Sequence, residues 1–371
     1  MAPFLRRLTS RNRAGREQGS GGRPDGGCKP AERLQGSAHL GAGVAGGSLA
    51  LLLALLGPGC APASSLQGAA GARSALVGAA GAAVVALPVN PSWPAGPDGL
   101  RYPLVPDAPT QLAALLAAVE QALRAADTPA SQLPALGHQQ QVIYRVLGHR
   151  PDLASRVRPQ LPPRWQHVFD LQLAARRAFI SMHSPSRRPQ LVPAWRIIAP
   201  EPPEHLLRYY HEAAAATGIP WQVLAAVNLV ESGMGRIDGV SVADAHGPMQ
   251  FLPSTWAEPG IGKGGDIRDP RTAIHAAARY LVRRGGLRDI RKALWGYNNS
   301  DAYGTGVLLY ARLLREDPAA YTGLYHWQIH YAAAGGDLWL PQGTSQPRPV
   351  AVATFLKQSP ASQPPPGSSG Y

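Results

Sequence analysis

The chain has 371 residues, of which 45% are hydrophobic, enough for a packed core in two or three domains of roughly 100–200 residues. The net charge is +13, and residues beyond position 60 still carry +8 of it, so anionic partners are favoured. Both cysteines, Cys28 and Cys60, precede position 61, which excludes a disulfide framework or a cysteine-ligated metal in the rest of the chain.

Residues 1–60 have the pattern of an export leader. Basic side chains precede an uncharged stretch over residues 34–72, whose most apolar part is residues 47–56. A basic flank followed by a short apolar run and small residues is typical of a secretory signal, with the basic end kept in the cytoplasm. We therefore expect an exported protein of the cell envelope or the extracellular space.

Three fates of this leader stay open. Cys60 resembles the attachment cysteine of a lipoprotein, although Leu56 stands four residues before it rather than three. Ala61-Pro62-Ala63 fits the small-residue pattern of ordinary signal cleavage. Residues 38–56 are nearly long enough to remain as an uncleaved membrane anchor, which needs about 20 residues.

Residues 61–107 are rich in Ala, Gly, Pro and Ser and are interpreted as a linker. Residues 108–198 follow as a helical accessory region. Thr110 is the expected cap of its first helix, and residues 141–147 and 165–180 are predicted as two more helices. The first helix has an apolar stripe at three- and four-residue spacing, formed by Leu112, Leu115, Leu116, Val119 and Leu123.

Residues 200–317 are predicted to form an all-α domain. Pro202-Pro203 opens a helix that closes at Gly218, and Pro220 opens the next one, which stops at Gly233. No alternation typical of strands appears in this region. Three later helices begin at caps provided by Asp269, Asp289 and Asp301.

Residues 318–342 form an aromatic-rich extension. Tyr325–Tyr331 is predicted to be a short strand, or one arm of a small β hairpin with Asp337–Leu340. Residues 343–371 are rich in Pro and Ser, and we expect them to be a disordered tail.

Glu231 is the residue whose position suggests chemistry. It follows Leu224 and Val227 at helical spacing, so its carboxyl lies on an apolar face at the end of a helix. Poor solvation of the charged form should raise its pKa above the usual value of about 4.3. A carboxyl protonated near neutral pH can donate its proton to a glycosidic oxygen, although position alone fits an ordinary surface glutamate equally well.

Four segments in order resemble the lytic transglycosylase family, whose SLT-like domain has the lysozyme fold. They are Glu231-Ser232-Gly233, Gly247-Pro248-Met249-Gln250-Phe251, residues 276–281 and Tyr297-Asn298-Asn299-Ser300. Residues 247–256 and 265–270 resemble actinobacterial members in particular. The matching motifs lie within residues 231–300, and the domain that they imply, residues 200–317, would be a lysozyme-like catalytic domain preceded by the helical accessory region.

This resemblance implies a role for each matched residue. Glu231 would act as general acid and then base, and Ser232 would hydrogen-bond near the acid or the departing sugar. The Gly247–Gln250 segment would line the saccharide cleft, with Met249 as an apolar wall and Gln250 as a polar contact. Tyr297 would orient Glu231 or the N-acetyl group, and Asn298 would contact the sugar. Pro248 and Asn299-Ser300 depart from the residues common in the family.

The leading hypothesis from the sequence is a peptidoglycan lytic transglycosylase, and two alternatives stay open. The resembled family cleaves peptidoglycan strands between N-acetylmuramic acid and N-acetylglucosamine with a single catalytic Glu, and leaves 1,6-anhydromuramic ends. A hydrolytic muramidase would need a second carboxylate near Glu231, for which Asp244 is preferred over Asp238 and Asp266. A peptidoglycan-binding protein without catalysis is the second alternative.

Further expectations concern partners and cofactors. A basic strip could follow anionic wall polymers or form an ordinary solvated helix face; it consists of Arg279, Arg283, Arg284, Arg288, Arg291 and Lys292. No nucleic-acid-binding motif is found, so nucleic acid is disfavoured. We expect no metal and no cofactor, because the histidines are scattered rather than spaced as ligands.

Overall fold

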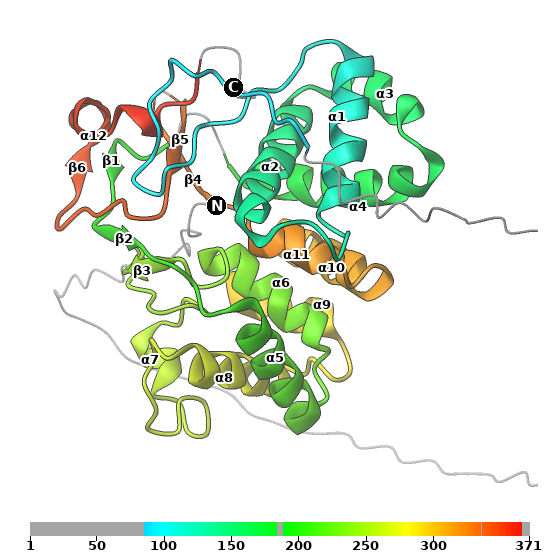
Figure 1. Cartoon of the computed structure of the whole chain (residues 1–371). Coiled ribbons are helices and arrows are strands. Elements are labelled where there is room, and N and C mark those ends of the chain that lie inside the picture. The colour runs from blue at the N-terminus through cyan, green and yellow to red at the C-terminus, as the bar shows by residue number, and fades with distance from the viewer. Residues whose placement is uncertain (1–84, 184–187, 335, 366–371) are drawn as a thin grey trace, which may run out of the picture. The chain divides into compact units, whose positions relative to one another are not determined.

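The computed structural model describes residues 85–183, 188–334 and 336–365 (Figure 1). The predicted leader with Cys60, and the first part of the predicted linker, lie outside these residues. Within the described ranges, no helix combines the length and the apolar character needed to cross a membrane.

Helices dominate the described chain. The predicted accessory region contains α1 (Pro109–Ala122), α2 (Leu133–His149), α3 (Pro151–Val157) and α4 (Pro163–Ser181). The next helices are α5 (Pro203–Thr217), α6 (Trp221–Ser232), α7 (Pro253–Trp256), α8 (Pro270–Arg283), α9 (Ile290–Asn298) and α10 (Asp301–Glu316). The last two are α11 (Ala320–Tyr325) and α12 (Val352–Gln358).

Short antiparallel strand pairs accompany the helices. β1 (Leu191–Val192) pairs with β6 (Val350–Ala351), and β2 (Trp195–Ile197) pairs with β3 (Ile237–Gly239). β4 (Ile329–Ala333) pairs with β5 (Gly336–Leu340), which confirms a hairpin in the aromatic-rich extension. The predicted bounds of its first arm, Tyr325–Tyr331, are wrong, because Tyr325 ends a helix and the strand begins at Ile329. The register of the hairpin places His330 opposite Trp339.

The predicted helix ends are largely confirmed. α5 ends at Gly218, and the side chains of Asp269 and Asp289 accept hydrogen bonds from backbone N–H groups in the first turns of α8 and α9. Two predicted caps are wrong. Thr110 lies inside α1, which begins at Pro109, and Ser300 rather than Asp301 caps α10 through its hydroxyl. α1 begins two residues earlier than a cap at Thr110 allows, and α10 begins one residue earlier than a cap at Asp301 allows.

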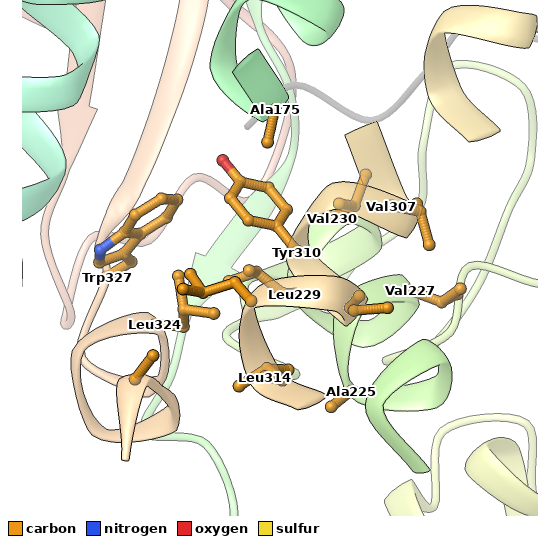
Figure 2. Close-up of a cluster of buried hydrophobic side chains, with 14 of the residues drawn as sticks. Ala175, Ala225, Val227, Leu229, Val230, Val307, Tyr310, Leu314, Leu324 and Trp327 are labelled. Carbon is orange, nitrogen blue, oxygen red and sulfur yellow. The ribbon is translucent and has the colours of Figure 1, made fainter. Parts of the chain in front are cut away.

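A hydrophobic core connects the predicted accessory region to the helices that follow it. α10 packs against both α4 and α6. Figure 2 shows this packing, in which Ala175 of α4, Leu229 and Val230 of α6, and Tyr310 of α10 lie close together. Burial of each large aliphatic side chain contributes about 1.5–3 kcal/mol. This core fixes α6 and α10 against each other, and both helices carry residues of the candidate site.

The expected disordered tail is wrong for residues 343–365. This segment forms β6 and α12, and Phe355 of α12 is fully buried. Phe355 joins a second core cluster with Trp195, Ile329 and Tyr331, which belong to β2 and β4. The tail therefore folds because the ring of Phe355 packs into an apolar cluster formed by distant parts of the chain, although most residues of this segment are Pro or small.

The described part of the predicted linker is also packed. Tyr102 is buried against the side chains of His138 and Trp339. The indole Nε1 of Trp93 donates a hydrogen bond of 3.1 Å to the carbonyl oxygen of Gln363. Residues 85–107 thus lie against later parts of the chain, although their composition indicated a loose connection.

Candidate active site

Glu231 lies in the last turn of α6, whose residues 223–232 are all buried. The side chains of Leu224 and Val227 are fully buried, and Glu231 itself is only 5% exposed. α6 stops directly after Ser232, because Gly233 adopts a left-handed conformation with φ of 62°. The predicted position of this carboxyl, on an apolar face at a helix end, is therefore confirmed.

The hydroxyl of Tyr303 donates a hydrogen bond of 2.7 Å to Oε1 of Glu231. Tyr303 lies in the first turn of α10 and is fully buried, so it acts on the carboxyl and does not touch solvent. Ser300 positions this turn by accepting a hydrogen bond from the backbone N–H of Tyr303. Tyr303 thus orients the carboxyl of Glu231 from a helix that packs against α6.

Tyr303 is absent from the set of site residues predicted above, although a signal for it exists. Tyr303, Val307, Tyr310 and Leu314 recur at spacings of four, three and four residues, and all are buried. A tyrosine at the start of such an inward stripe needs a partner for its hydroxyl. The stripe alone does not say that this partner is Glu231.

If the chain performs the glycan cleavage that its sequence resemblance implies, replacing Tyr303 with Phe is expected to lower kcat on soluble glycan strands by about 10- to 100-fold, because one hydrogen bond to the carboxyl of Glu231 is lost. KM is expected to stay within about twofold, since the buried ring does not contact the sugar. The check is steady-state kinetics beside Tyr209→Phe, a matched change at a tyrosine outside the site. A rise in KM with unchanged kcat would contradict the positioning role.

Ser232 is fully buried, which leaves the alternative of hydrogen bonds near the acid rather than with the departing sugar. Its hydroxyl donates a hydrogen bond to the carbonyl oxygen of Pro248 and accepts one of 3.0 Å from the backbone N–H of Gly235. The amide of Asn228 also donates to the Pro248 carbonyl oxygen, at 2.8 Å. These bonds attach the segment that begins at Gly247 to the end of α6.

Residues 246–251 form a tight turn beside this helix end. His246 and Phe251 exchange backbone hydrogen bonds of 2.8 and 3.0 Å. Gly247 has φ of 72°, and a Cβ atom there would lie 2.0 Å from the carbonyl oxygen of Ile267. Only glycine fits this position, because both the conformation and the close backbone exclude a side chain.

Gly247→Ala is expected to lower the free energy of unfolding by about 3 kcal/mol or more, from left-handed strain plus the clash with Ile267. Gly264→Ala is the matched control. Gly264 has φ of 75° but no atom within 4 Å of an added Cβ, so it should lose only about 1–2 kcal/mol. Urea denaturation measures both variants, and equal losses would contradict the packing argument.

Gln250 carries the polar side chain of this turn. It is 5% exposed, and its Nε2 donates a hydrogen bond of 2.9 Å to the carbonyl oxygen of Gly247. Its Oε1 is buried without a hydrogen-bond partner among the described residues. Because a buried acceptor without a partner is unfavourable, this oxygen is suited to a donor that a ligand would supply.

Met249, Tyr297 and Asn298 complete the predicted set. Met249 is fully buried, so its side chain is part of the core and does not form the predicted cleft wall. Its carbonyl oxygen accepts a hydrogen bond of 2.7 Å from the hydroxyl of Tyr297, whose ring stacks on that of Tyr303. Tyr297 therefore links the turn to the tyrosine that holds the acid. Asn298 ends α9 and is half-buried.

Each carboxylate considered as a second catalytic group has a contact of its own. Asp244 is exposed and lies 2.9 Å from Nε2 of His246. Asp238 forms an ion pair with Arg196. Asp266 accepts a hydrogen bond from the backbone N–H of Arg268. None of these contacts involves Glu231.

The basic strip is largely tied to the protein. Arg279 and Arg283 donate to the carbonyl oxygens of Ile261 and Pro259, and Arg283 also pairs with Glu258. Arg284 donates to the hydroxyl of Tyr280 and lies over its ring, and Arg291 donates to Thr305. Four of the six cations therefore contact other groups of the protein, and binding of anionic wall polymers stays a prediction. In the described part of the chain, no group of three or more His, Cys, Asp or Glu side chains could hold a metal.

A pocket of about 760 Å³ lies beside the turn. Met234, Gly235, Gly247 and Pro248 form one part of its lining, next to the end of α6. Other parts come from β2, β3, the start of α8 and the segment at Gln346. Glu231 does not line this pocket. The pocket lies beside the end of α6, the helix that carries Glu231.

Comparison with known proteins identifies part of the chain. Residues 208–304 match the family described as the transglycosylase SLT domain. The search of curated proteins and the search of solved structures found no match. The matched residues include Glu231, Gly247 and Tyr303, and the match confirms the predicted lysozyme-like, mostly helical fold class. The predicted actinobacterial type stays a prediction.

Proposed function

Because residues 208–304 form a transglycosylase SLT domain, we propose that this protein cleaves the β-1,4 bond between N-acetylmuramic acid and N-acetylglucosamine in peptidoglycan. The products would carry 1,6-anhydromuramic ends, and the reaction would serve remodelling of the cell wall. The observation that carries the proposal is the buried carboxyl of Glu231, held at Oε1 by Tyr303.

One carboxyl performs both proton transfers in the proposed mechanism. Glu231 first donates its proton to the glycosidic oxygen, and the bond between this oxygen and C1 of the muramic sugar breaks. The resulting carboxylate then accepts the proton of the C6 hydroxyl of the same sugar. The C6 oxygen bonds to C1 and closes the anhydro ring, so no water is consumed.

Several features of the site support this single-acid chemistry. Glu231 is buried at the end of an apolar helix face, where little water surrounds the carboxyl that would donate the proton. Gln250 offers a buried carbonyl oxygen to a donor such as the N–H of an N-acetyl group. Asp244, the preferred second carboxylate, is exposed and lies beside His246.

The test is digestion of purified peptidoglycan followed by mass spectrometry of the released muropeptides. We expect anhydro ends, which are one water lighter than reducing ends. Reducing ends would overturn the proposal in favour of a hydrolytic muramidase. If wild-type protein releases nothing yet sediments with the wall, the chain is a peptidoglycan-binding protein.

We propose that the protein acts outside the cytoplasmic membrane, where this substrate lies. The basic and apolar pattern of residues 1–60 supports export. Cell fractionation of wild type and Cys60→Ala separates the alternatives. A lipid anchor predicts that only the variant leaves the membrane fraction, signal cleavage predicts that neither is retained there, and an uncleaved segment predicts that both are.

A further inference from the structure

The pocket beside the turn is built partly by segments outside the SLT match. Ala194, Arg196 and Ile198 lie before residue 208, and Gln346 and Pro347 lie after residue 304. The SLT segment contributes the wall that includes Gly235 and Pro248. The pocket is therefore a feature of this whole chain, attached to the edge of the candidate active site.

Backbone hydrogen bonds hold these added walls in place. β2 pairs with β3 inside the SLT segment, with Ile197 opposite Ile237. On its other side, the N–H of Ile197 donates 2.8 Å to the carbonyl oxygen of Thr344, and the N–H of Gln346 donates 2.8 Å to that of Trp195. Such ladders fix the walls before any ligand arrives, which lowers the entropic cost of binding.

One of the two arginines that line the pocket has a guanidinium without a charged partner among the described residues. Arg196 pairs with Asp238, and Glu201 lies 3.3 Å from Nδ1 of His205. Arg268, which precedes the cap of α8, is exposed, and its guanidinium has no hydrogen bond or ion pair with any described residue. A planar guanidinium is suited to binding a carboxylate through two parallel hydrogen bonds.

The rest of the lining favours a peptide over a further sugar. Ile198, Ala199, Pro200 and Pro347 provide aliphatic surface. Among the described residues that line the pocket there is no Trp, Tyr or Phe ring on which a sugar face could stack. An aliphatic pocket with one unpartnered cation therefore fits a short acidic peptide with small apolar side chains.

We propose that this pocket binds the carboxylate-bearing stem peptide of the glycan strand, and that Arg268 is its carboxylate ligand. The inference rests on the proposed function, which supplies the substrate class. The pocket shares Gly247 and Pro248 with the turn beside Glu231, so a peptide bound there stays attached to a sugar near the acid. β2 and the segment at Gln346 thus give this enzyme a preference for strands that carry peptides.

Binding is tested without turnover in the full-length Glu231→Gln protein. Calorimetry with a muramyl tetrapeptide is expected to show that Arg268→Gln raises Kd by about tenfold or more, because a charge-assisted pair is lost. Arg268→Lys keeps the charge but not the two-pronged geometry and should give an intermediate Kd. Arg288→Gln, an exposed arginine outside the pocket, is the matched control and should leave Kd unchanged.

Two further ligands identify what Arg268 recognises. The same muramyl tetrapeptide with amidated carboxyl groups should bind with equal Kd whether or not the protein carries the Arg268→Gln substitution. A tetramer of N-acetylglucosamine, which has no carboxylate, should not respond to this substitution either. An unchanged Kd for the tetrapeptide, or an equal loss for the sugar tetramer, would overturn the proposal.

The result is separable from the test of the proposed function. Anhydro ends, together with a Kd that does not change on Arg268→Gln, would reject only the proposed peptide pocket. Binding that depends on Arg268, with no release of muropeptides by the wild type, would reject only the catalytic function.

Discussion

Glu231→Gln is expected to lower the rate of muropeptide release by about a thousandfold, because an amide cannot donate a proton to the glycosidic oxygen. The fold should survive, since glutamine has nearly the same shape and its carbonyl oxygen can still accept the hydrogen bond from Tyr303. Release is measured by mass spectrometry of digested peptidoglycan, and folding by the urea midpoint.

The matched control is Glu204→Gln, which changes an exposed glutamate in the first turn of α5. It removes the same charge and should leave release unchanged. If Glu231→Gln cleaves at the wild-type rate, the assignment of the acid is wrong. If both variants lose activity equally, the loss reports the charge of the protein and not the chemistry of Glu231.

A second large effect is expected on the stability of the fold at low pH. Its source is a buried polar network whose residues are far from Glu231 in sequence. Nε2 of His138 in α2 lies 3.2 Å from Nε2 of His330 in β4. Nδ1 of His330 lies 3.1 Å from Oδ2 of Asp337, which Arg145 also binds. With Nδ1 donating to the carboxylate, Nε2 of His330 must accept, so His138 donates to it.

Both histidines are expected to stay neutral in the folded protein. Burial, followed by the charge of Arg145, lowers the pKa of His330 to about 3. Burial and the neighbouring His330 hold the pKa of His138 well below its usual value. Burial alone would raise the pKa of Asp337, but Arg145 and His330 outweigh it and keep that pKa low.

The sign of the pH effect follows from these directions. In the unfolded chain both histidines titrate near 6.5, so below that pH the unfolded state binds more protons than the folded state and stability falls. Between pH 7 and pH 5 the two together should lose about 4 kcal/mol of unfolding free energy. Asp337 adds nothing in this window, because its unfolded form titrates near 3.8.

Urea denaturation at pH 7, 6 and 5 measures this loss. His138→Gln keeps a donor near His330 but removes one titrating group. Its loss should be about 2 kcal/mol smaller than that of the wild type, to which His149 and His326, whose pKa values burial lowers to about 4, also contribute. His211→Gln is the control, because His211 is exposed outside the network. A wild-type loss below about 1 kcal/mol would show that the network takes up protons without unfolding.

Much of the fold could be predicted because its signals are local. Asp269 before Pro270, and Gly218 after an apolar stripe, place helix ends within one or two residues of the structure. The errors at Thr110 and Asp301 are small, since several neighbouring residues can begin a helix. The prediction of a disordered tail is wrong for another reason: the burial of Phe355 outweighs a composition typical of disorder.

The candidate site divides in the same way. Glu231 could be predicted because the spacing of apolar residues in α6 indicates that its side chain is buried. Gly247 could be predicted because it begins one of the segments that resemble the transglycosylase family. Met249, predicted as an apolar wall of the cleft, and Ser232, predicted near the acid or the departing sugar, are both fully buried. Sequence neighbours of a catalytic residue need not face its ligand, since successive helix positions point in different directions.

Local sequence patterns specify which faces of the helices are apolar, where most helices end and which carboxyl stands out. The partners that those faces meet depend on how the folded helices and strands pack together. Tyr303 reaches Glu231 across 72 positions, and His138 reaches His330 across 192. Periodicity specifies that a side chain is buried, but the packing of α10 on α6 and of the β4–β5 hairpin beside α2 selects the group that it touches.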